Sequence, residues 1–370
     1  MADLKPAKPI NLDVLIRVLD KTVLSPSVAG LAVIYTYMFQ KQQCSQTSIL
    51  AYQGMTSSHL LQPFLRTMRH YAAANANGFP KWSSRVWASK SWEHGIRGLL
   101  GINRIKWDGQ IAVVTGGSQG LGKAIVTLLR KKGARVVVLD MRIPSKAEWE
   151  DGVIYYQCDV SDNQRVSELA KQIEQEVGRT TILINNAGFV SGRPLLELSE
   201  DEIRKTFNVN TLAQFWTLKA FLPSIIANGG GHIVNVASIL GTMGVAGAAD
   251  YCSSKFAVIG LHEALKGEVE TYKTKNRIYL SVVLPAQIRT ALFANLKPFS
   301  PLAAFLLPML EPEDIAKRIV CNIEHQRTGE IAMPVLANIT WLWRALPSYA
   351  SDFLRWIAEA DDSMSQFHKK

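Results

Sequence analysis

A glycine-rich turn between a short apolar run and a predicted helix constrains the fold of this chain more than any other feature. Residues 111–114 have the composition of a buried parallel strand, and residues 123–132 place apolar side chains at helical spacing. Between them, residues 115–122 read Thr-Gly-Gly-Ser-Gln-Gly-Leu-Gly. Glycines at such a turn let a pyrophosphate approach the start of the helix closely, because no Cβ stands in the way. The pattern predicts a βαβ unit that binds a dinucleotide within a doubly wound parallel sheet.

An acidic residue at the end of the next predicted strand bears on which dinucleotide is bound. Residues 134–139 form a second apolar run, which ends at Asp140, eighteen residues after Gly122. A carboxylate there accepts hydrogen bonds from the adenosine ribose and repels a 2′-phosphate, so Asp140 favours NAD. Arg142 lies two residues further on and could accommodate a 2′-phosphate, so NADP remains an alternative.

Tyr251 and Lys255 form a candidate proton-transfer pair. They are four residues apart, a spacing that puts two side chains on one face of a helix. A lysine ammonium there would lower the tyrosine pKa from about 10 and make the phenol usable as an acid or base near neutral pH. Ser238, thirteen residues upstream of Tyr251, could hold a substrate oxygen. Taken alone, the same spacing also fits a surface pair on any helix, so the neighbouring motifs decide between the two interpretations.

A series of further motifs follows residues 115–122 along the chain. They are Cys158-Asp159-Val160, the Asn-Asn-Ala-Gly of residues 185–188, Phe207-Asn208-Val209-Asn210, the strand-like residues 233–238 that end in Ser238, and Tyr251 with Lys255. In kind and in order, these motifs between residues 109 and 329 resemble those of the short-chain dehydrogenase/reductase family. The runs 206–223, with Phe215-Trp216, and 251–261 resemble those of its membrane-associated branch, which contains retinol dehydrogenases and 17-beta-hydroxysteroid dehydrogenase-like enzymes.

The resemblance implies an α/β fold, the doubly wound parallel sheet of a Rossmann domain, and a catalytic tetrad. Tyr251 would be the general acid or base, and Lys255 would lower its pKa and hold the nicotinamide ribose. Ser238 would bind the substrate oxygen, and Asn210 would order a water that links Lys255 to solvent. No metal is implied, and His232 and His262 are expected to be structural.

The resemblance also implies the cofactor contacts, with NAD expected and NADP possible. The family usually has Pro-Gly where this chain has Pro285-Ala286, which puts the backbone conformation there in doubt. The expected cofactor-binding residues are Thr115, Gly116, Ser118, Gln119, Gly120, Leu121, Gly122, Asp140, Asp159, Val160, Asn186, Ala187, Gly188, Tyr251, Lys255, Pro285, Ile288 and Thr290.

Residues 1–105 are predicted to be a membrane-anchoring extension. The net charge is +10, and residues 1–109 hold 13 Lys and Arg against 5 acids, which leaves +8 in that part. The run 22–40 has no formal charge, and its length is close to that of a membrane span. A buried helix of the extension also explains this run. Tryptophans alternate with Lys and Arg over residues 81–107, as at a membrane interface or in a solvated linker. We expect a membrane partner and no nucleic acid, at the endoplasmic reticulum or a lipid droplet, with the catalytic domain facing the cytosol.

Two apolar stretches complete the chain. Residues 291–310, within the predicted dehydrogenase domain 106–335, contain three prolines and correspond to the family's substrate lid, although core packing also explains them. Residues 336–370 form an aromatic tail that fits an interfacial segment near that lid.

We therefore predict an NAD(P)-dependent oxidoreductase that interconverts a lipophilic alcohol, retinoid-, steroid- or fatty-alcohol-like, with its carbonyl form. The resemblance also implies a homodimer. Two alternatives remain: an NADPH-dependent lipid or biosynthetic ketone reductase, and a catalytically inactive NAD-binding scaffold on a membrane.

Overall fold

The computed structural model describes residues 104–145, 151–272, 274–293 and 300–362, together with Met364 and Phe367. The predicted anchor, residues 22–40, and nearly all of the basic, tryptophan-containing segment lie outside these residues. Within them, no helix is both long enough and apolar enough to cross a bilayer.

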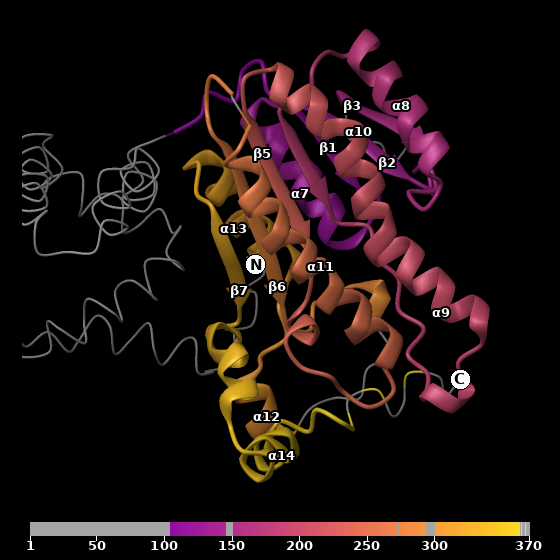
Figure 1. The fold of residues 1–370 in the computed structure, drawn as a ribbon, viewed down its shortest axis with the longest axis vertical. Helices are drawn as coiled ribbons and strands as arrows, with labels where there is room; N and C mark the ends of the chain where they lie inside the picture. The colour runs from indigo at the N-terminus through magenta and orange to yellow at the C-terminus, as the bar shows by residue number, and fades with distance from the viewer. Residues whose placement is uncertain are drawn as a thin grey trace, which may run out of the picture.

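Seven strands form one sheet in the order β3-β2-β1-β4-β5-β6-β7, and every neighbouring pair is parallel (Figure 1). This is the doubly wound order, which reverses direction between β1 and β4 and leaves a crevice there at the carboxyl ends of the strands. The predicted fold class is confirmed. The strands are β1 (Ile111–Thr115), β2 (Arg135–Asp140), β3 (Val153–Gln157), β4 (Ile182–Asn185), β5 (Gly231–Val236), β6 (Ile278–Pro285) and β7 (Gly329–Met333).

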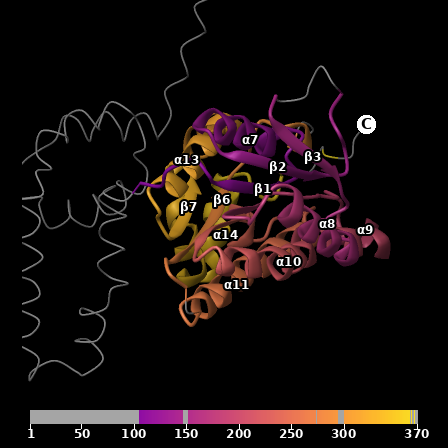
Figure 2. The same cartoon turned by 90° about the horizontal axis from the view of Figure 1, so that it is seen from above.

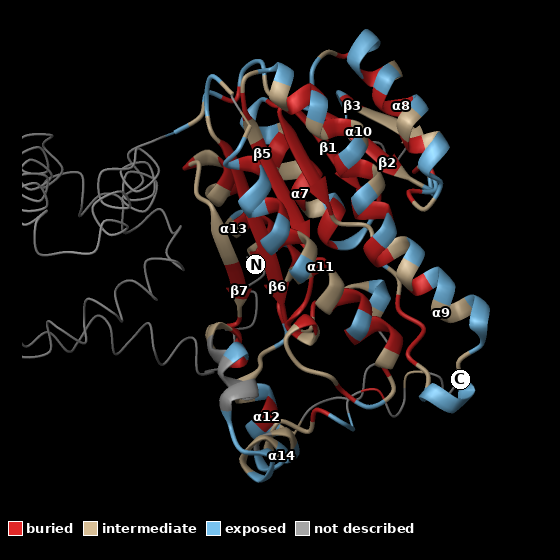
Figure 3. Ribbon diagram, in the orientation of Figure 1, coloured by how far each residue is buried: buried red, intermediate tan, exposed pale blue. Residues whose placement is uncertain are grey.

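Helices cover both faces of the sheet, as Figure 2 shows from above. On one face lie α7 (Gly120–Lys132) and α13 (Pro312–Glu324), and on the other lie α8 (Asn163–Glu176), α10 (Ala213–Ala227) and α11 (Ala249–Val269). Successive β1 residues point to opposite faces, so Ala112 and Val114 join one buried cluster while Ile111 and Val113 join the other. The sheet is therefore buried on both sides (Figure 3), and this explains why its strands are apolar throughout rather than alternating.

The remaining elements lie at or near the carboxyl edge of the sheet. Ser199 and Glu202 form a reciprocal capping box that starts α9. The predicted lid region contains η5 and α12, and its residues 294–299 lie outside the described part. These elements are η2 (Leu195–Glu197), α9 (Glu200–Phe207), the π-helical η3 (Asn208–Leu212), η4 (Ile239–Gly241), η5 (Ala291–Phe293), α12 (Pro301–Leu306), η6 (Val335–Ala345) and α14 (Ser348–Ile357).

Candidate active site

The glycine loop between β1 and α7 is built around positions that no larger residue fits. A Cβ on Gly122 would lie 2.0 Å from the Gly116 carbonyl oxygen, and Gly116 has a φ of +64°. A Cβ on Gly116 would lie 2.9 Å from the Ala187 Cα, so the loop packs directly against the backbone that follows β4. Both glycines are therefore required by close backbone approach, as the sequence predicted.

Hydrogen bonds fasten this loop to the Asn-Asn-Ala-Gly segment. The Thr115 hydroxyl oxygen accepts from the backbone N–H groups of Asn186 at 2.9 Å and Ala187 at 3.0 Å. The Asn186 side-chain amide donates to the Thr115 and Gly116 carbonyls, at 3.0 Å each. The two motifs, seventy residues apart in the chain, thus form one rigid unit.

The start of α7 is free to receive an anion. Its N-cap residue, Gln119, makes no side-chain capping bond, so the first N–H groups of the helix lack a side-chain cap. Nearby, the Asp140 carboxylate accepts from the Ser118 N–H at 3.0 Å and from the Arg142 N–H at 3.0 Å. Asp140 therefore lies at the loop, where the sequence placed the ribose-binding carboxylate. Glycines that admit a close ligand and an uncapped helix start fit the pyrophosphate of a dinucleotide.

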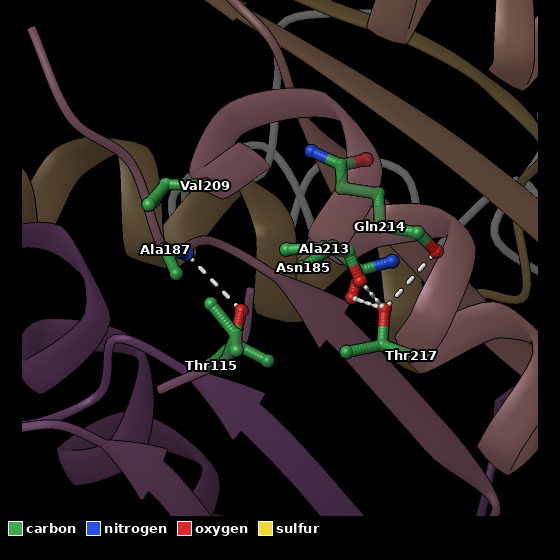
Figure 4. Close-up of a pocket in the computed structure, with 8 residues that line it drawn as sticks. Thr115, Asn185, Ala187, Val209, Ala213, Gln214 and Thr217 are labelled. Carbon is green, nitrogen blue, oxygen red and sulfur yellow. Dashed lines mark hydrogen bonds between the residues drawn. The ribbon is translucent and has the colours of Figure 1, made fainter. Parts of the chain in front are cut away.

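A small recess lies beside Thr115, between the strands and α10 (Figure 4). Val160 and Ala187, both expected at the cofactor, contribute apolar surface to it. Figure 4 shows the Gln214 amide turned away from Thr217; Gln214 is only 3% exposed, and neither of its amide atoms has a hydrogen-bond partner. The lining residues are Thr115, Val160, Asn185, Ala187, Val209, Ala213, Gln214 and Thr217.

A buried polar network beneath this recess was missed by the sequence reasoning. The Asn185 amide donates to the Asn235 side-chain oxygen at 3.0 Å, and the Asn185 oxygen accepts from the Thr217 hydroxyl at 2.7 Å. Asn235 in turn lies 3.5 Å from His262 Nδ1. Burial lowers the pKa of His262 to about 4, so the ring is neutral at physiological pH. The signal in the sequence was the polar residue at the end of each apolar strand, Asn185 and Asn235.

Tyr251, Ser238 and Lys255 meet at the carboxyl end of β5. Tyr251 and Lys255 lie in the first two turns of α11 and are 5% and 3% exposed, so the surface-pair interpretation is excluded. Ser238 follows β5, and its hydroxyl acts on the Tyr251 hydroxyl so as to lower the tyrosine pKa. The Lys255 ammonium lies 5.6 Å from the Tyr251 ring centroid and donates to the Val236 carbonyl at 3.1 Å.

The predicted lowering of the Tyr251 pKa is wrong for this arrangement. Burial raises the pKa of Tyr251 above 10, and the Ser238 hydroxyl opposes only part of that effect. Desolvation disfavours the charged phenolate. The spacing between Tyr251 and Lys255 in the sequence gives no information about this burial. Burial also lowers the pKa of Lys255, to about 8.

Asn210 lies in the π-helical turn η3, and its amide is fully used. Its side-chain oxygen accepts from the Phe189 N–H at 2.7 Å, and its nitrogen donates to the Phe189 carbonyl and the Ser254 hydroxyl, at 2.9 Å each. A Cβ on Gly188 would lie 3.6 Å from the Asn210 oxygen and 3.8 Å from the Lys255 nitrogen. Asn210 and Lys255 therefore flank Gly188 on the catalytic side of the loop. Single π turns within helices are frequent at functional sites.

The segment after β6 reaches back to the glycine loop. Ala286, which stands where the family usually has glycine, donates its N–H to the Met333 carbonyl at 2.8 Å and is buried. Ile288 forms a parallel bridge with Leu310. The Thr290 methyl lies 3.2 Å from where a Gly120 Cβ would be, so Thr290 stands against the predicted pyrophosphate loop despite the alanine.

The predicted site residues thus come together from eight separate segments at one edge of the sheet. Leu121 is buried beneath the loop. Pro285 pairs with Met333 in the sheet, and its carbonyl lies 3.4 Å from the Ser238 hydroxyl. Asp159 is exposed and accepts from the N–H and hydroxyl of Ser161, in a turn next to Val160.

This combination defines a class of protein: a Rossmann-fold oxidoreductase that takes a nicotinamide dinucleotide. The family model for short chain dehydrogenases matches residues 110–300. The chain belongs to that family and is an oxidoreductase that acts on CH–OH groups, interconverting alcohol and carbonyl compounds with NAD or NADP.

Several curated relatives are similar over most of their length. Epidermal retinol dehydrogenase 2 of Mus musculus is 38% identical over 248 residues, which is 65% of this chain and 79% of the relative. Short-chain dehydrogenase/reductase family 16C member 6 of Bos taurus is 37% identical over 62% of this chain and 74% of the relative. Retinol dehydrogenase 10-B of Danio rerio is 33% identical over 70% of this chain and 85% of the relative.

Solved structures share the fold. A short chain dehydrogenase from Burkholderia cenocepacia in complex with NADP has a TM-score of 0.56 at 25% identity, covering 68% of this chain and 98% of that chain. Thermoplasma acidophilum aldohexose dehydrogenase also has a TM-score of 0.56, at 22% identity, covering 64% of this chain and 96% of that chain.

Proposed function

We propose that the chain is a dehydrogenase/reductase of lipophilic alcohols that prefers NAD and uses Tyr251 as its proton donor and acceptor. The observation that carries the proposal is the burial of Tyr251 and Lys255 at the end of β5, with the Ser238 hydroxyl acting on the phenol and with Asn210 and Lys255 both beside Gly188.

Each of the four side chains has a distinct role in the proposal. Ser238 holds the substrate oxygen next to the Tyr251 hydroxyl and stabilises the charge that develops on it. Tyr251 donates its proton to that oxygen in reduction and removes it in oxidation. Lys255, charged below its pKa of about 8, provides the positive potential beside the phenol. Asn210 holds the Phe189 backbone, and thereby the segment that follows Gly188, in place.

The cofactor would be held by the rigid loop unit already described. The α7 N-terminus receives the pyrophosphate, and Asp140 receives the adenosine ribose. A nicotinamide dinucleotide held by these residues would supply the hydride-transfer chemistry. Thr290 lies against Gly120, where it would contact the cofactor at the loop.

Replacement of Tyr251 by phenylalanine tests the proposed chemistry. We expect Tyr251→Phe to reduce kcat by at least about a hundredfold while NADH affinity, measured by fluorescence titration, is unchanged. Tyr272→Phe is the matched control, because Tyr272 lies beyond the end of α11 and its hydroxyl contacts only a surface glutamate, Glu268, at 3.5 Å. Undiminished turnover in Tyr251→Phe would refute the assignment, and a wild-type chain that binds NADH but turns over no alcohol would favour the inactive scaffold.

The preference for NAD rests on the position of Asp140. Its carboxylate lies against the loop, where a 2′-phosphate would meet a like charge. The competing assignment, an NADPH-dependent ketone reductase, has support from the NADP-bound relative and from Arg142 next to Asp140. Comparison of kcat/KM for NAD and NADP in one assay separates the two.

A lipophilic substrate is supported by the surroundings of Tyr251 and by the relatives. Val190, Val245 and Phe293 form an apolar cluster with Tyr251, and the Phe293 ring meets the tyrosine ring edge-on at 6.3 Å between centroids. Two of the relatives described above carry the name retinol dehydrogenase. A screen of retinoids, steroids and long-chain alcohols with both cofactors would identify the class, and preference for a polar sugar alcohol would contradict the proposal.

Attachment to a membrane, at the endoplasmic reticulum or a lipid droplet, is supported by an exposed apolar face. We use the term exposed apolar face for the exposed large apolar side chains on and next to α12, η6 and α14, and large exposed apolar patches are typical of interaction sites. Flotation with vesicles tests the attachment, and protease protection on intact membranes tests whether the catalytic domain faces the cytosol. The exposed residues are Leu302, Met309, Trp341, Leu346, Tyr349, Phe353 and Trp356.

A homodimer formed through the face of α9, α10 and α11 is also part of the proposal. Leu212 and Phe215 are about two-fifths exposed on that face, at 38% and 40%. Phe215→Glu would then convert the dimer to a monomer in light scattering of detergent-solubilised protein, and a monomeric wild-type chain would exclude this part of the proposal.

A further inference from the structure

The end of the chain packs over Tyr251, and neither the sequence motifs nor the proposed chemistry accounts for this contact. Tyr251 belongs to a buried apolar cluster with Val190, Val245, Ala360 and Met364, and Phe367 packs against the same cluster. In Figure 1 the chain beyond α14 crosses beneath the carboxyl ends of the strands toward α9. We use the name C-terminal flap for the described residues of this part, which are residues 358–362, Met364 and Phe367.

Two glycines on the site side of this contact allow very close approach. A Cβ on Gly192, in the loop after β4, would lie 2.3 Å from the Phe367 ring, and Gly192 has a φ of +69°. A Cβ on Gly247, in the loop before α11, would lie 3.0 Å from the Met364 Cβ, and Gly247 has a φ of +74°. The flap therefore rests directly on the two loops that lead from Gly188 and Ser238, the catalytic edge of the sheet.

Polar contacts hold the flap at its outer side. The Asp361 carboxylate accepts from the Ala246 N–H at 3.0 Å and from Arg355 Nε at 3.2 Å. The Glu359 carboxylate accepts from the Ser300 N–H at 3.1 Å, at the start of α12. These groups are partly exposed, and ion pairs of that kind contribute little to stability. The side of the flap that packs on the site is therefore apolar, and its remaining contacts are partly exposed polar ones.

From these contacts we infer that the C-terminal flap is the substrate-side wall of the site and that Met364 and Phe367 select bulky apolar alcohols. With the flap in place Tyr251 is 5% exposed, so an alcohol must displace the flap or pack against its inner side chains to reach the phenol. Methionine and phenylalanine adapt to large apolar surfaces and offer no partner to a polar substrate. The inference rests on the proposed function, since it assigns a substrate class to the same site.

Alanine substitutions in the full-length, detergent-solubilised chain test the selection. We expect Met364→Ala and Phe367→Ala each to lower kcat/KM for retinol and oestradiol by about tenfold, and for cyclohexanol by less than about twofold. NADH affinity should be unchanged, which would show that the variants are folded. Leu196→Ala is the matched control, because Leu196 is an apolar residue near the same loop and is 98% exposed. Equal losses for large and small alcohols, or none, would overturn the selective role.

A second measurement needs no substrate. Cys252 lies in the same cluster as Met364, and burial raises the pKa of its thiol, whereas Cys158 is buried in a different cluster. Alkylation of Cys252 by N-ethylmaleimide should become about tenfold faster in both flap variants, with Cys158 and the Leu196→Ala chain unchanged. Unchanged protection of Cys252 would overturn the inference. If the wild-type chain oxidises no alcohol and Cys252 nevertheless reacts faster in the flap variants, the proposed function is refuted. The inference about the position of the flap then still holds.

Discussion

Gly122→Ala is the substitution for which the structure makes the sharpest claim about the cofactor loop. The added methyl group would lie 2.0 Å from the Gly116 carbonyl oxygen and 2.6 Å from the Asn186 amide nitrogen. Those two atoms are themselves hydrogen bonded, at 3.0 Å. The methyl group must therefore separate them, because backbone and a fastened side chain cannot yield as the end of a flexible side chain does.

The cost follows from three contributions. Overpacking of this kind costs about 1–3 kcal/mol. Loss of the hydrogen bond between Asn186 and Gly116 adds roughly 0.5–1.5 kcal/mol. Gly122 is the third residue of α7, so the higher helix propensity of alanine returns at most about 1 kcal/mol. The net loss of about 2 kcal/mol corresponds to a fall in Tm of roughly 4–8 °C for a domain of this size.

Thermal unfolding and NADH titration together measure this effect. Besides the lower Tm, we expect NADH affinity to fall by at least about tenfold, because the loop that receives the pyrophosphate has moved. Gly267→Ala, on the exposed side of α11 where nothing lies within 4 Å, is the matched control. It should leave NADH binding unchanged and raise stability by a few tenths to about 1 kcal/mol. A Gly122→Ala chain with the wild-type Tm and NADH affinity would refute the loop geometry.

Three further predictions concern charge and pH. Because burial lowers the pKa of Lys255 to about 8, its positive charge is present below that pH, and kcat/KM for carbonyl reduction should fall as pH rises through about 8, as initial rates between pH 6 and 10 would show. Asp140→Ala should shift the ratio of kcat/KM for NAD over NADP by about a hundredfold toward NADP, and a ratio that stays constant would contradict the role of the carboxylate. The pKa of His262 is lowered from 6.5 to about 4, so the unfolded chain binds more protons and stability is lost as pH falls from about 6.5 toward 4. His262→Gln should therefore lower the midpoint of acid unfolding, measured by circular dichroism, and an unchanged midpoint would show that His262 does not limit acid stability.

The fold and the loop could be predicted because their determinants are local. An apolar run, a glycine turn and an amphipathic segment lie within residues 111–132, and each of these segments favours one local conformation. The predicted strand 134–139 was found at Arg135–Asp140, a shift of one residue. Ser238 was placed at the end of a strand, and it lies two residues beyond the last residue of β5.

What the sequence could not predict depends on partners distant in the chain. Phe367 against Gly192 joins residues 175 positions apart, and neither residue belongs to a motif. The hydrogen bond between Asn185 and Asn235 joins two neighbouring strands, and no spacing in the sequence pairs the two asparagines. The direction of the Tyr251 pKa shift was mistaken for the same reason, since burial is a property of the assembled fold.

The two sides of Tyr251 are built from different kinds of contact, and this division suits an enzyme that must hold its chemistry fixed while admitting large substrates. On the proton-transfer side the fastenings are buried hydrogen bonds, among them the Thr206 hydroxyl to Asp250 at 2.6 Å and the Thr211 hydroxyl to the Ser254 carbonyl at 3.0 Å. Each joins α11 to the segment that carries Asn210. Breaking one such bond leaves a buried polar group unpaired and costs about 1–3 kcal/mol, so this side is rigid.

On the substrate side, apolar contacts and partly exposed ion pairs hold the flap, and these can separate without leaving a buried polar group unpaired. Change in the flap would therefore alter which alcohol is accepted before it altered how the proton is transferred. If both proposals hold, specificity at Met364 and Phe367 is separate from catalysis at Tyr251 and Ser238, although both sets of side chains lie near the end of β5.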